Sequence, residues 1–225
     1  MFSIIIPAHQ EEKYIGETLG ALSKVVEGEC KNNCEVIVVC NACTDRTADI
    51  SRTFRDKLNI RVIETGKRGV SFARNLGAKY AKGNILVFLD ADIVISKGFL
   101  TAISRAVKDG AEIGTCKARA SSNRLFDNIL MMLKSLTHYF GVSTGVIFVT
   151  RRLFERIGGF NEDLSVGEDG DFIRRAMKQG KYKVADAYIF NNMRRFEKKG
   201  YINIFLFWIK HAFSGKNTKK YEVVR

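Results

Sequence analysis

The chain has 225 residues and a mass of 25.4 kDa, with 46% hydrophobic and 27% charged residues. This size and balance are typical of one folded globular domain, and they exclude a disordered or collagen-like chain. The net charge of +13 suggests an anionic partner, such as a phosphorylated substrate, a nucleic acid or a membrane surface.

No stretch of the sequence approaches the ~20 consecutive apolar residues that a membrane-spanning helix needs, and no basic leader precedes residues 2–7. We therefore expect a cytoplasmic protein. The five cysteines are an odd number, so free thiols are expected rather than a disulfide framework. Four of them lie within residues 30–43, but the gap between the two pairs is shorter than in zinc ribbons, which disfavours a structural zinc site.

The first half of the chain alternates short β-branched runs with amphipathic segments. This pattern predicts an α/β fold, a single domain in which helices flank a mostly parallel sheet. Residues Ile15, Leu19, Leu22 and Val26 recur at helical spacing and predict a helix after the first strand. The expected strands are 2–6, 35–40, 60–64, 85–89 and 146–149. A second helix is expected after a cap at Thr44 or Asp45. Further helices are expected at 72–82, 97–108, 169–179 and 200–213.

An apolar strand ends in two carboxylates, Asp90 and Asp92. Ligands of open α/β sheets bind beyond the carboxyl ends of the strands. Side chains two apart on an extended chain point the same way, so both acids can face one divalent cation that bridges to a diphosphate. Taken alone, the pair is more typical of a strand end followed by a helix-capping aspartate.

The acidic pair is the last of four ordered segments, after residues 4–12, 38–47 and 69–75. Together, over roughly residues 2–200, they resemble the inverting family 2 glycosyltransferases of GT-A (Rossmann-like) fold. The resemblance implies a UDP- or GDP-sugar donor, a glycan or other hydroxyl acceptor, and Mn²⁺ or Mg²⁺ as cofactor. It also divides the chain into a glycosyltransferase domain at 1–199, with a donor nucleotide-binding half at 1–95 and an acceptor-side half at 96–199, and a C-terminal segment at 200–225.

In that family, the loop after the first strand and the end of the second strand hold the donor nucleotide. Cys40 stands where the family usually has an acid, and a thiol is a poorer hydrogen-bond acceptor than a carboxylate, so the sequence does not name the base. The basic turn at 66–69 precedes a helix and suits phosphate oxygens, although Gly69 and Arg74 are also compatible with a plain turn and a solvated face. By resemblance, Asp92 is the metal ligand and the donor-binding residues are Pro7, Ala8, Gln10, Glu11, Asn41, Gly69, Arg74 and Asp90, with Cys40 beside them.

A second acidic cluster spans residues 166–171. An inverting transfer needs a carboxylate that removes the proton of the acceptor hydroxyl during attack. By resemblance to the family's Glu-Asp motif, Asp169 is this base and Glu168 binds the acceptor. The alternative is a helix start that acids stabilise electrostatically, which is the role expected of Asp171. Of the three histidines, His9 lies in the donor loop, and neither His138 nor His211 has motif support as a metal ligand.

Residues 191–225 hold nine Lys and Arg against two Glu, and the aromatic residues of the C-terminal segment 200–225 recur at helical spacing. Such a basic amphipathic helix is typical of peripheral membrane contact at the inner face of the cell membrane, with a lipid-linked acceptor. One alternative is a helix that packs on the sheet with a solvated basic tail. Another is that Arg194 and Arg195 reach the donor diphosphate. Two rival functions are a basic nucleic-acid-binding module and a sugar-nucleotide nucleotidyltransferase. The paired acids and the acidic loop at 9–12 disfavour both, so no nucleic-acid partner is expected.

Overall fold

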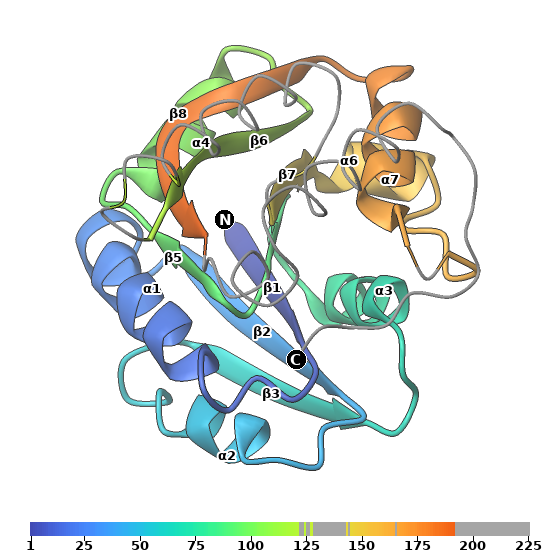
Figure 1. Ribbon diagram of the computed structural model, residues 1–225. Helices are drawn as coiled ribbons and strands as arrows, with labels where there is room; N and C mark the ends of the chain where they lie inside the picture. Colours follow the sequence, from blue (N-terminus) through green and yellow to red (C-terminus); the bar gives the residue numbers. More distant parts are fainter. Residues whose placement is uncertain (122–123, 125–126, 128–142, 144, 165, 192–225) are drawn as a thin grey trace.

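The computed structural model describes residues 1–121, 124, 127, 143, 145–164 and 166–191 (Figure 1). The expected α/β single domain with helices on both faces of a sheet is confirmed. The strands are β1 (Phe2–Ala8), β2 (Cys34–Asn41), β3 (Ile60–Thr65), β4 (Ile85–Leu89), β5 (Ile93–Ile95), β6 (Ile113–Ala120), β7 (Val146–Thr150) and β8 (Tyr182–Asn191). The helices are α1 (Ile15–Glu29), α2 (Thr47–Arg52), α3 (Val70–Tyr80), α4 (Phe99–Lys108), α6 (Arg151–Arg156) and α7 (Glu168–Met177).

The described strands form one sheet in the order β3-β2-β1-β4-β7-β6-β8-β5. The pairings from β3 to β4 are all parallel, which matches the part of the sheet that the sequence predicts. Beyond β4 the sheet is mixed, because β7 runs antiparallel to both β4 and β6, and β5 runs antiparallel to β8. The carboxyl ends of β1, β2 and β4 therefore share one edge, where ligands of such sheets bind.

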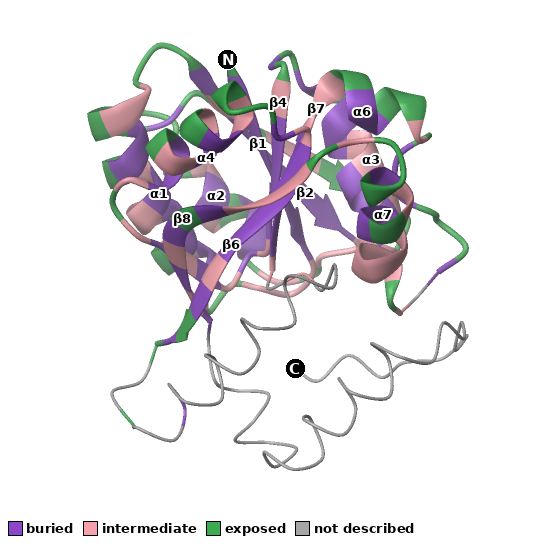
Figure 2. Ribbon diagram, turned by 90° about the horizontal axis from the view of Figure 1, so that it is seen from above, coloured by how far each residue is buried: buried purple, intermediate pink, exposed green. Residues whose placement is uncertain are grey.

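Both faces of the sheet are buried, as the nearly continuous apolar runs of β1 and β2 require (Figure 2). Successive side chains of a strand point to opposite faces. Ile4 and Ile6 belong to the core that includes residues of α1, α2 and α4, whereas Ile5 belongs to the core that includes residues of α3, α6 and α7. Helices therefore cover both faces of the sheet and fix the edge at which the strands end.

Helix starts differ from the expected ones by up to two residues. The cap expected at Thr44 or Asp45 is wrong, because Arg46 is the N-cap of α2 and makes no side-chain cap hydrogen bond. Asp45 still contributes, since its Oδ1 accepts a hydrogen bond from the backbone N–H of Thr47 at 3.1 Å. No helix within the described residues is long and apolar enough to cross a membrane. The apolar run 125–136, apart from residue 127, lies outside the described residues, as do the tail 192–225, His138 and His211.

Candidate active site

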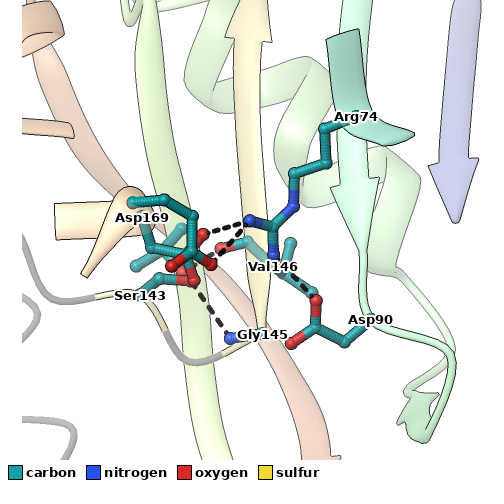
Figure 3. Close-up of polar contacts among 8 residues, drawn as sticks. Arg74, Asp90, Ser143, Gly145, Val146 and Asp169 are labelled. Carbon is teal, nitrogen blue, oxygen red and sulfur yellow. Dashed lines mark hydrogen bonds and ion pairs between the residues drawn. The ribbon is translucent and has the colours of Figure 1, made fainter. Parts of the chain in front are cut away.

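Arg74 of α3 lies at the centre of a cluster of three carboxylates, shown in part in Figure 3. Its Nη1 donates to Oδ1 of Asp169 at 2.5 Å and to Oε1 of Glu168 at 3.1 Å. Its Nη2 donates to Oδ1 of Asp90 at 3.0 Å. The residue is only 3% exposed, and its Cζ lies 5.1 Å from the centre of the Phe160 ring. Three predicted acidic residues therefore meet around the buried guanidinium of a fourth predicted site residue, Arg74.

Strand ends and a helix start position the three acids. Asp90 directly follows β4, and its backbone N–H donates to the carbonyl of Gly145 at 2.9 Å. Gly145 has φ +103°, and a Cβ there would lie 3.1 Å from Oδ2 of Asp90, so only glycine leaves this carboxylate its space. Glu168 and Asp169 form the first turn of α7, after Gly167 with φ +76°. The helix start favours negative charge, so the electrostatic reason for these acids coexists with their place in the cluster.

The cluster changes the proton affinity of Asp169. The pKa of Asp169 is raised to about 7, because burial and the like charges of Glu168 and Asp90 outweigh the opposing effect of Arg74. Burial opposes the charge of Arg74, but the three carboxylates, led by Asp169, hold the pKa of this guanidinium above its usual value. A carboxyl with a pKa near neutrality, next to a permanent cation, is suited to accept a proton during a reaction.

Asp90 and Asp92 lie in the turn between β4 and β5, where the backbone N–H of Ile93 donates to the carbonyl of Asp90 at 3.3 Å. The expected extended strand is therefore wrong at this point, and its alternation does not set the direction of the two carboxylates. Within the described residues, no group of three or more His, Cys, Asp and Glu side chains is arranged to hold a metal ion. Mg²⁺ is usually bound through one or two protein carboxylates together with substrate phosphates, and Mn²⁺ also favours oxygen ligands, so this pair fits either cation.

The loops after β1 and β2, both predicted to bind the donor, are joined by hydrogen bonds. Gln10, with φ +58°, accepts at Oε1 from the backbone N–H of Thr44 at 2.8 Å and donates from Nε2 to its hydroxyl at 2.7 Å. The backbone N–H of Glu11 donates to the hydroxyl of Thr47 at 2.8 Å. The two loops are thus one connected unit, and a displacement of either one acts on the other.

Asn41 connects this unit to α3. Its Nδ2 donates to the carbonyl of Ala8 at 2.9 Å, and its Oδ1 accepts from the backbone N–H of Gly69 at 3.3 Å. Nδ1 of His9 lies 2.7 Å from the carbonyl of Asn41, which can only accept, so this ring nitrogen donates. Pro7 and Cys40 are buried in the adjacent strands β1 and β2. The predicted donor residues from 7 to 69 therefore gather at one sheet edge, and their contacts to a nucleotide stay predictions.

One connection was missed by sequence reasoning. Asn75 of α3 accepts at Oδ1 from the backbone N–H of Phe160 and donates from Nδ2 to its carbonyl, both at 2.9 Å, and donates to Glu162 at 3.1 Å. Lys67 also donates to Glu162, at 2.8 Å. Gly158 and Gly159, which both have positive φ, are a turn signal in the sequence, but nothing in the sequence indicates that the turn binds Asn75. The turn fixes α3, and hence Arg74, against the second half of the chain.

Comparisons with known proteins agree with this geometry. The sequence matches the family described as glycosyl transferase family 2 over residues 3–202. The poly(ribitol-phosphate) beta-N-acetylglucosaminyltransferase TarS of Staphylococcus aureus is 40% identical over 98 residues, which are 43% of this chain and 17% of that protein. The glycosyltransferase AglE of Haloferax volcanii is 30% identical over 194 residues, which are 79% of this chain and 62% of that protein. The chain thus spans only part of the length of these relatives.

Solved structures show the same fold. The crystal structure of S. aureus TarS residues 1–349 in complex with UDP-GlcNAc has a TM-score of 0.69 at 26% identity, covering 83% of this chain and 57% of that one. The mannosyltransferase PcManGT of Pyrobaculum calidifontis, in complex with GDP-Man and Mn²⁺, has a TM-score of 0.65 at 22% identity, covering 83% of this chain and 56% of that one, and supports the fold alone. Because the family match covers most of the chain, this protein belongs to glycosyl transferase family 2 and has the GT-A fold.

Proposed function

We propose that this chain transfers a sugar from a UDP-sugar to a hydroxyl group of a glycan or lipid-linked acceptor, with inversion at the anomeric carbon and with a divalent cation. The observation that carries the proposal is the cluster of Asp90, Glu168 and Asp169 around Arg74 at the carboxyl ends of the strands. UDP is preferred to GDP because TarS, solved with UDP-GlcNAc, is the more similar of the two neighbours in sequence and in TM-score.

Asp169 is suited to be the general base. It lies in the first turn of α7, and its pKa of about 7 lets it take a proton at neutral pH. As the acceptor oxygen attacks the anomeric carbon on the face opposite the leaving diphosphate, the proton passes to the carboxylate of Asp169. One direct displacement inverts the configuration. Glu168, which precedes it in the same turn, would hold the acceptor hydroxyl.

Arg74 serves both the base and the donor. Its ion pair with Asp169 orients that carboxylate and favours its ionised form, because a neighbouring positive charge lowers a carboxyl pKa. Guanidinium groups also bind phosphate oxygens through paired, charge-assisted hydrogen bonds. We infer that Arg74 contacts the donor diphosphate when the donor binds.

Asp92 would be the metal ligand, with Asp90 beside it as a donor contact. A bound Mn²⁺ or Mg²⁺ supplies positive charge that stabilises the departing diphosphate. The nucleoside would lie along the sheet edge, and the residues expected to contact it are Pro7, Ala8, Gln10, Glu11, Asn41 and Gly69. These residues hold the base and ribose in place while the anomeric carbon faces Asp169.

The acceptor is proposed from charge. A net charge of +13 favours an anionic acceptor, such as the phosphate polymer in the name of TarS, or a lipid-linked glycan at an anionic membrane. The basic aromatic segment 200–225 would supply the membrane contact. If deleting this segment leaves cosedimentation with anionic liposomes unchanged, the membrane part of the proposal is wrong.

The test of the base is Asp169→Asn, compared with Asp171→Asn as the matched control. Asp171 lies in the same helix turn but pairs with Arg175, at 2.8 Å, outside the Arg74 cluster. With UDP-GlcNAc as the donor probe and UDP release as the readout, Asp169→Asn should slow turnover by about 10²–10⁴-fold while UDP affinity is kept. The control should stay near the wild-type rate. Wild-type turnover in Asp169→Asn would remove this residue as the base.

A further inference from the structure

Strand β2 carries a pair of thiols at each end. Cys40 and Cys43 lie at its carboxyl end, where the thiol of Cys43 donates to the carbonyl of Ala8 in the neighbouring strand, and Cys30 and Cys34 lie at its start. All five cysteines are free thiols. Only Cys40 and Cys43 lie at the sheet edge of the candidate donor site, and their spacing, with two residues between them, is that of redox-active dithiols.

The chain between these two cysteines makes a tight turn over the end of β1. Ala42 has φ +52°, a left-handed conformation, and it brings Cys43 back to the thiol of Cys40. The thiol of Cys43 donates to the carbonyl of Ala8 at 3.4 Å. In the β1–β2 register, Ala8 is also the partner of Cys40. Both sulfurs are therefore anchored at the carboxyl end of β1.

The two thiols differ in exposure and reactivity. Cys43 is half-buried, and a hydrogen bond from Cys40, aided by the backbone of Gln10 and the hydroxyl of Thr47, lowers the pKa of Cys43 to about 7 despite its burial. Cys40 is only 1% exposed, and both its hydrogen bond to Cys43 and its burial raise its pKa. Cys43 is thus the thiolate that can attack, and Cys40 is the buried partner that resolves.

We propose that Cys40 and Cys43 form a reversible disulfide that weakens donor binding; its effect on the donor rests on the proposed function. The thiolate of Cys43 attacks one sulfur of a low-molecular-weight disulfide, forms a mixed disulfide and releases one thiolate. Cys40 then loses its proton, attacks the sulfur of Cys43 and displaces the second thiolate. The two cysteines lose two protons and two electrons, and the small disulfide is reduced to two thiols. A low-molecular-weight dithiol reverses the reaction.

Oxidation changes the donor loops directly. A disulfide holds its sulfurs about 2.0 Å apart, closer than two unbonded thiols can approach, so residue 43 must move toward β2. The S–H of Cys43 is lost, and the carbonyl of Ala8 keeps only the hydrogen bond from Asn41 of the two described above. Because Gln10 bonds to Thr44, the movement passes to the loop after β1. Both predicted nucleotide-binding loops are therefore displaced.

The experiment compares the whole reduced chain with the chain treated with oxidised glutathione at pH 7.5. Peptide mapping by mass spectrometry reads the bond, hydrogen exchange reads the amides of residues 9–12 and 42–47, and calorimetry reads UDP affinity with Mn²⁺. We expect a disulfide between Cys40 and Cys43 that dithiothreitol reverses, faster exchange in both loops, and UDP affinity lower by about tenfold or more. Cys30→Ser, which breaks only the far pair, should respond to oxidation as the wild type does, and Cys43→Ser should not respond.

A disulfide only between Cys30 and Cys34, or a lasting glutathione adduct on Cys43, overturns the proposal. So does a Cys40–Cys43 disulfide that leaves loop exchange and UDP affinity unchanged. If the reduced chain binds no nucleotide, the proposed function fails instead. The mass and exchange measurements then still decide whether the dithiol forms and moves the loops.

Discussion

At the scale of single residues, Arg74 has the largest electrostatic role in the described structure. It balances the charges of Asp90, Glu168 and Asp169 from a position that is almost completely buried. Removing one partner from a buried ionic group is strongly destabilising, because it leaves uncompensated charge. The same residue is proposed to orient the base and to bind the donor diphosphate, so its replacement should affect folding and catalysis together.

Arg74→Gln should lower the free energy of unfolding by about 3 kcal/mol at pH 7.5. Without the cation, the pKa of Asp169 rises further above its usual value, so Asp169 takes up a proton as the pH falls and the loss should shrink at pH 5.5. Urea unfolding at the two pH values measures this difference. The control is Arg52→Gln, whose partners Asp49 and Glu64 are exposed, and which should cost less than about 1 kcal/mol. An equally small loss in Arg74→Gln would contradict the role of the cluster.

The pH dependence of turnover should report Asp169. Its pKa is raised to about 7, so the protonated, inactive form dominates below that pH and kcat/KM should rise as the pH increases through about 7. Arg74 lowers this pKa and Glu168 raises it. The rise in kcat/KM should therefore move to higher pH in Arg74→Gln and to lower pH in Glu168→Gln. Profiles of UDP-sugar turnover for the three proteins measure these shifts. If kcat/KM of all three proteins rises near pH 4, Asp169 is excluded as the titrating base.

Single residues also show where sequence reasoning stops. The acids and Arg74 could be named from the sequence because they lie in ordered segments that resemble those of a known family. Their ion pairs could not be, because the side chains come from segments about 95 residues apart, as for Arg74 and Asp169. The direction of Asp92 was predicted from an extended strand, but the chain turns immediately after β4.

At the scale of elements, the site depends on how α3 packs. A Cβ at Gly77 would overlap Cγ2 of Ile5 in β1, so the glycine lets this helix approach the sheet. Arg74 and Asn75 lie one turn or less before Gly77 on the same helix. Any shift of α3 away from β1 therefore moves the guanidinium relative to the three acids.

Gly77→Ala should destabilise the protein by about 1–3 kcal/mol, because overpacking forces the helix away from the strand. It should also weaken UDP binding, since Arg74 moves with the helix. Gly20→Ala is the matched control in α1, where a Cβ would meet nothing within 4 Å, and it should gain about 0.5–1 kcal/mol from helix propensity. Thermal unfolding and calorimetry on both variants test the contrast. Equal stability of the two would show that α3 does not need this close approach.

Most of the strands that the sequence predicted are buried along most of their length, whereas the predicted strand β3 has no buried residue. β1, β2 and β4 read as continuous apolar runs because both faces are covered. β6 and β8 were missed because charged residues interrupt them, at Lys117 and Arg119 in β6 and at Lys183 and Asp186 in β8. β5 has only three residues, too few for a period to be read.

At the scale of the whole molecule, two halves of the chain meet at the candidate active site. Asp90 comes from the parallel half, whereas Glu168 and Asp169 come from the part that follows the antiparallel strand β7. The rule for ligand sites in α/β sheets predicted the edge for Asp90 from the sequence. It could not predict that β7 lies beside β4, and this pairing is what brings α7 near α3 (Figure 1).

The most direct test of the account is calorimetric titration of the purified chain with UDP and with GDP, each with and without Mn²⁺, on the wild type and Asp92→Asn. We predict that UDP binds more tightly than GDP, that Mn²⁺ strengthens its binding, and that Asp92→Asn removes the strengthening by Mn²⁺. Failure of both nucleotides to bind the wild type in the presence of Mn²⁺ would contradict the assignment of this sheet edge as the donor site.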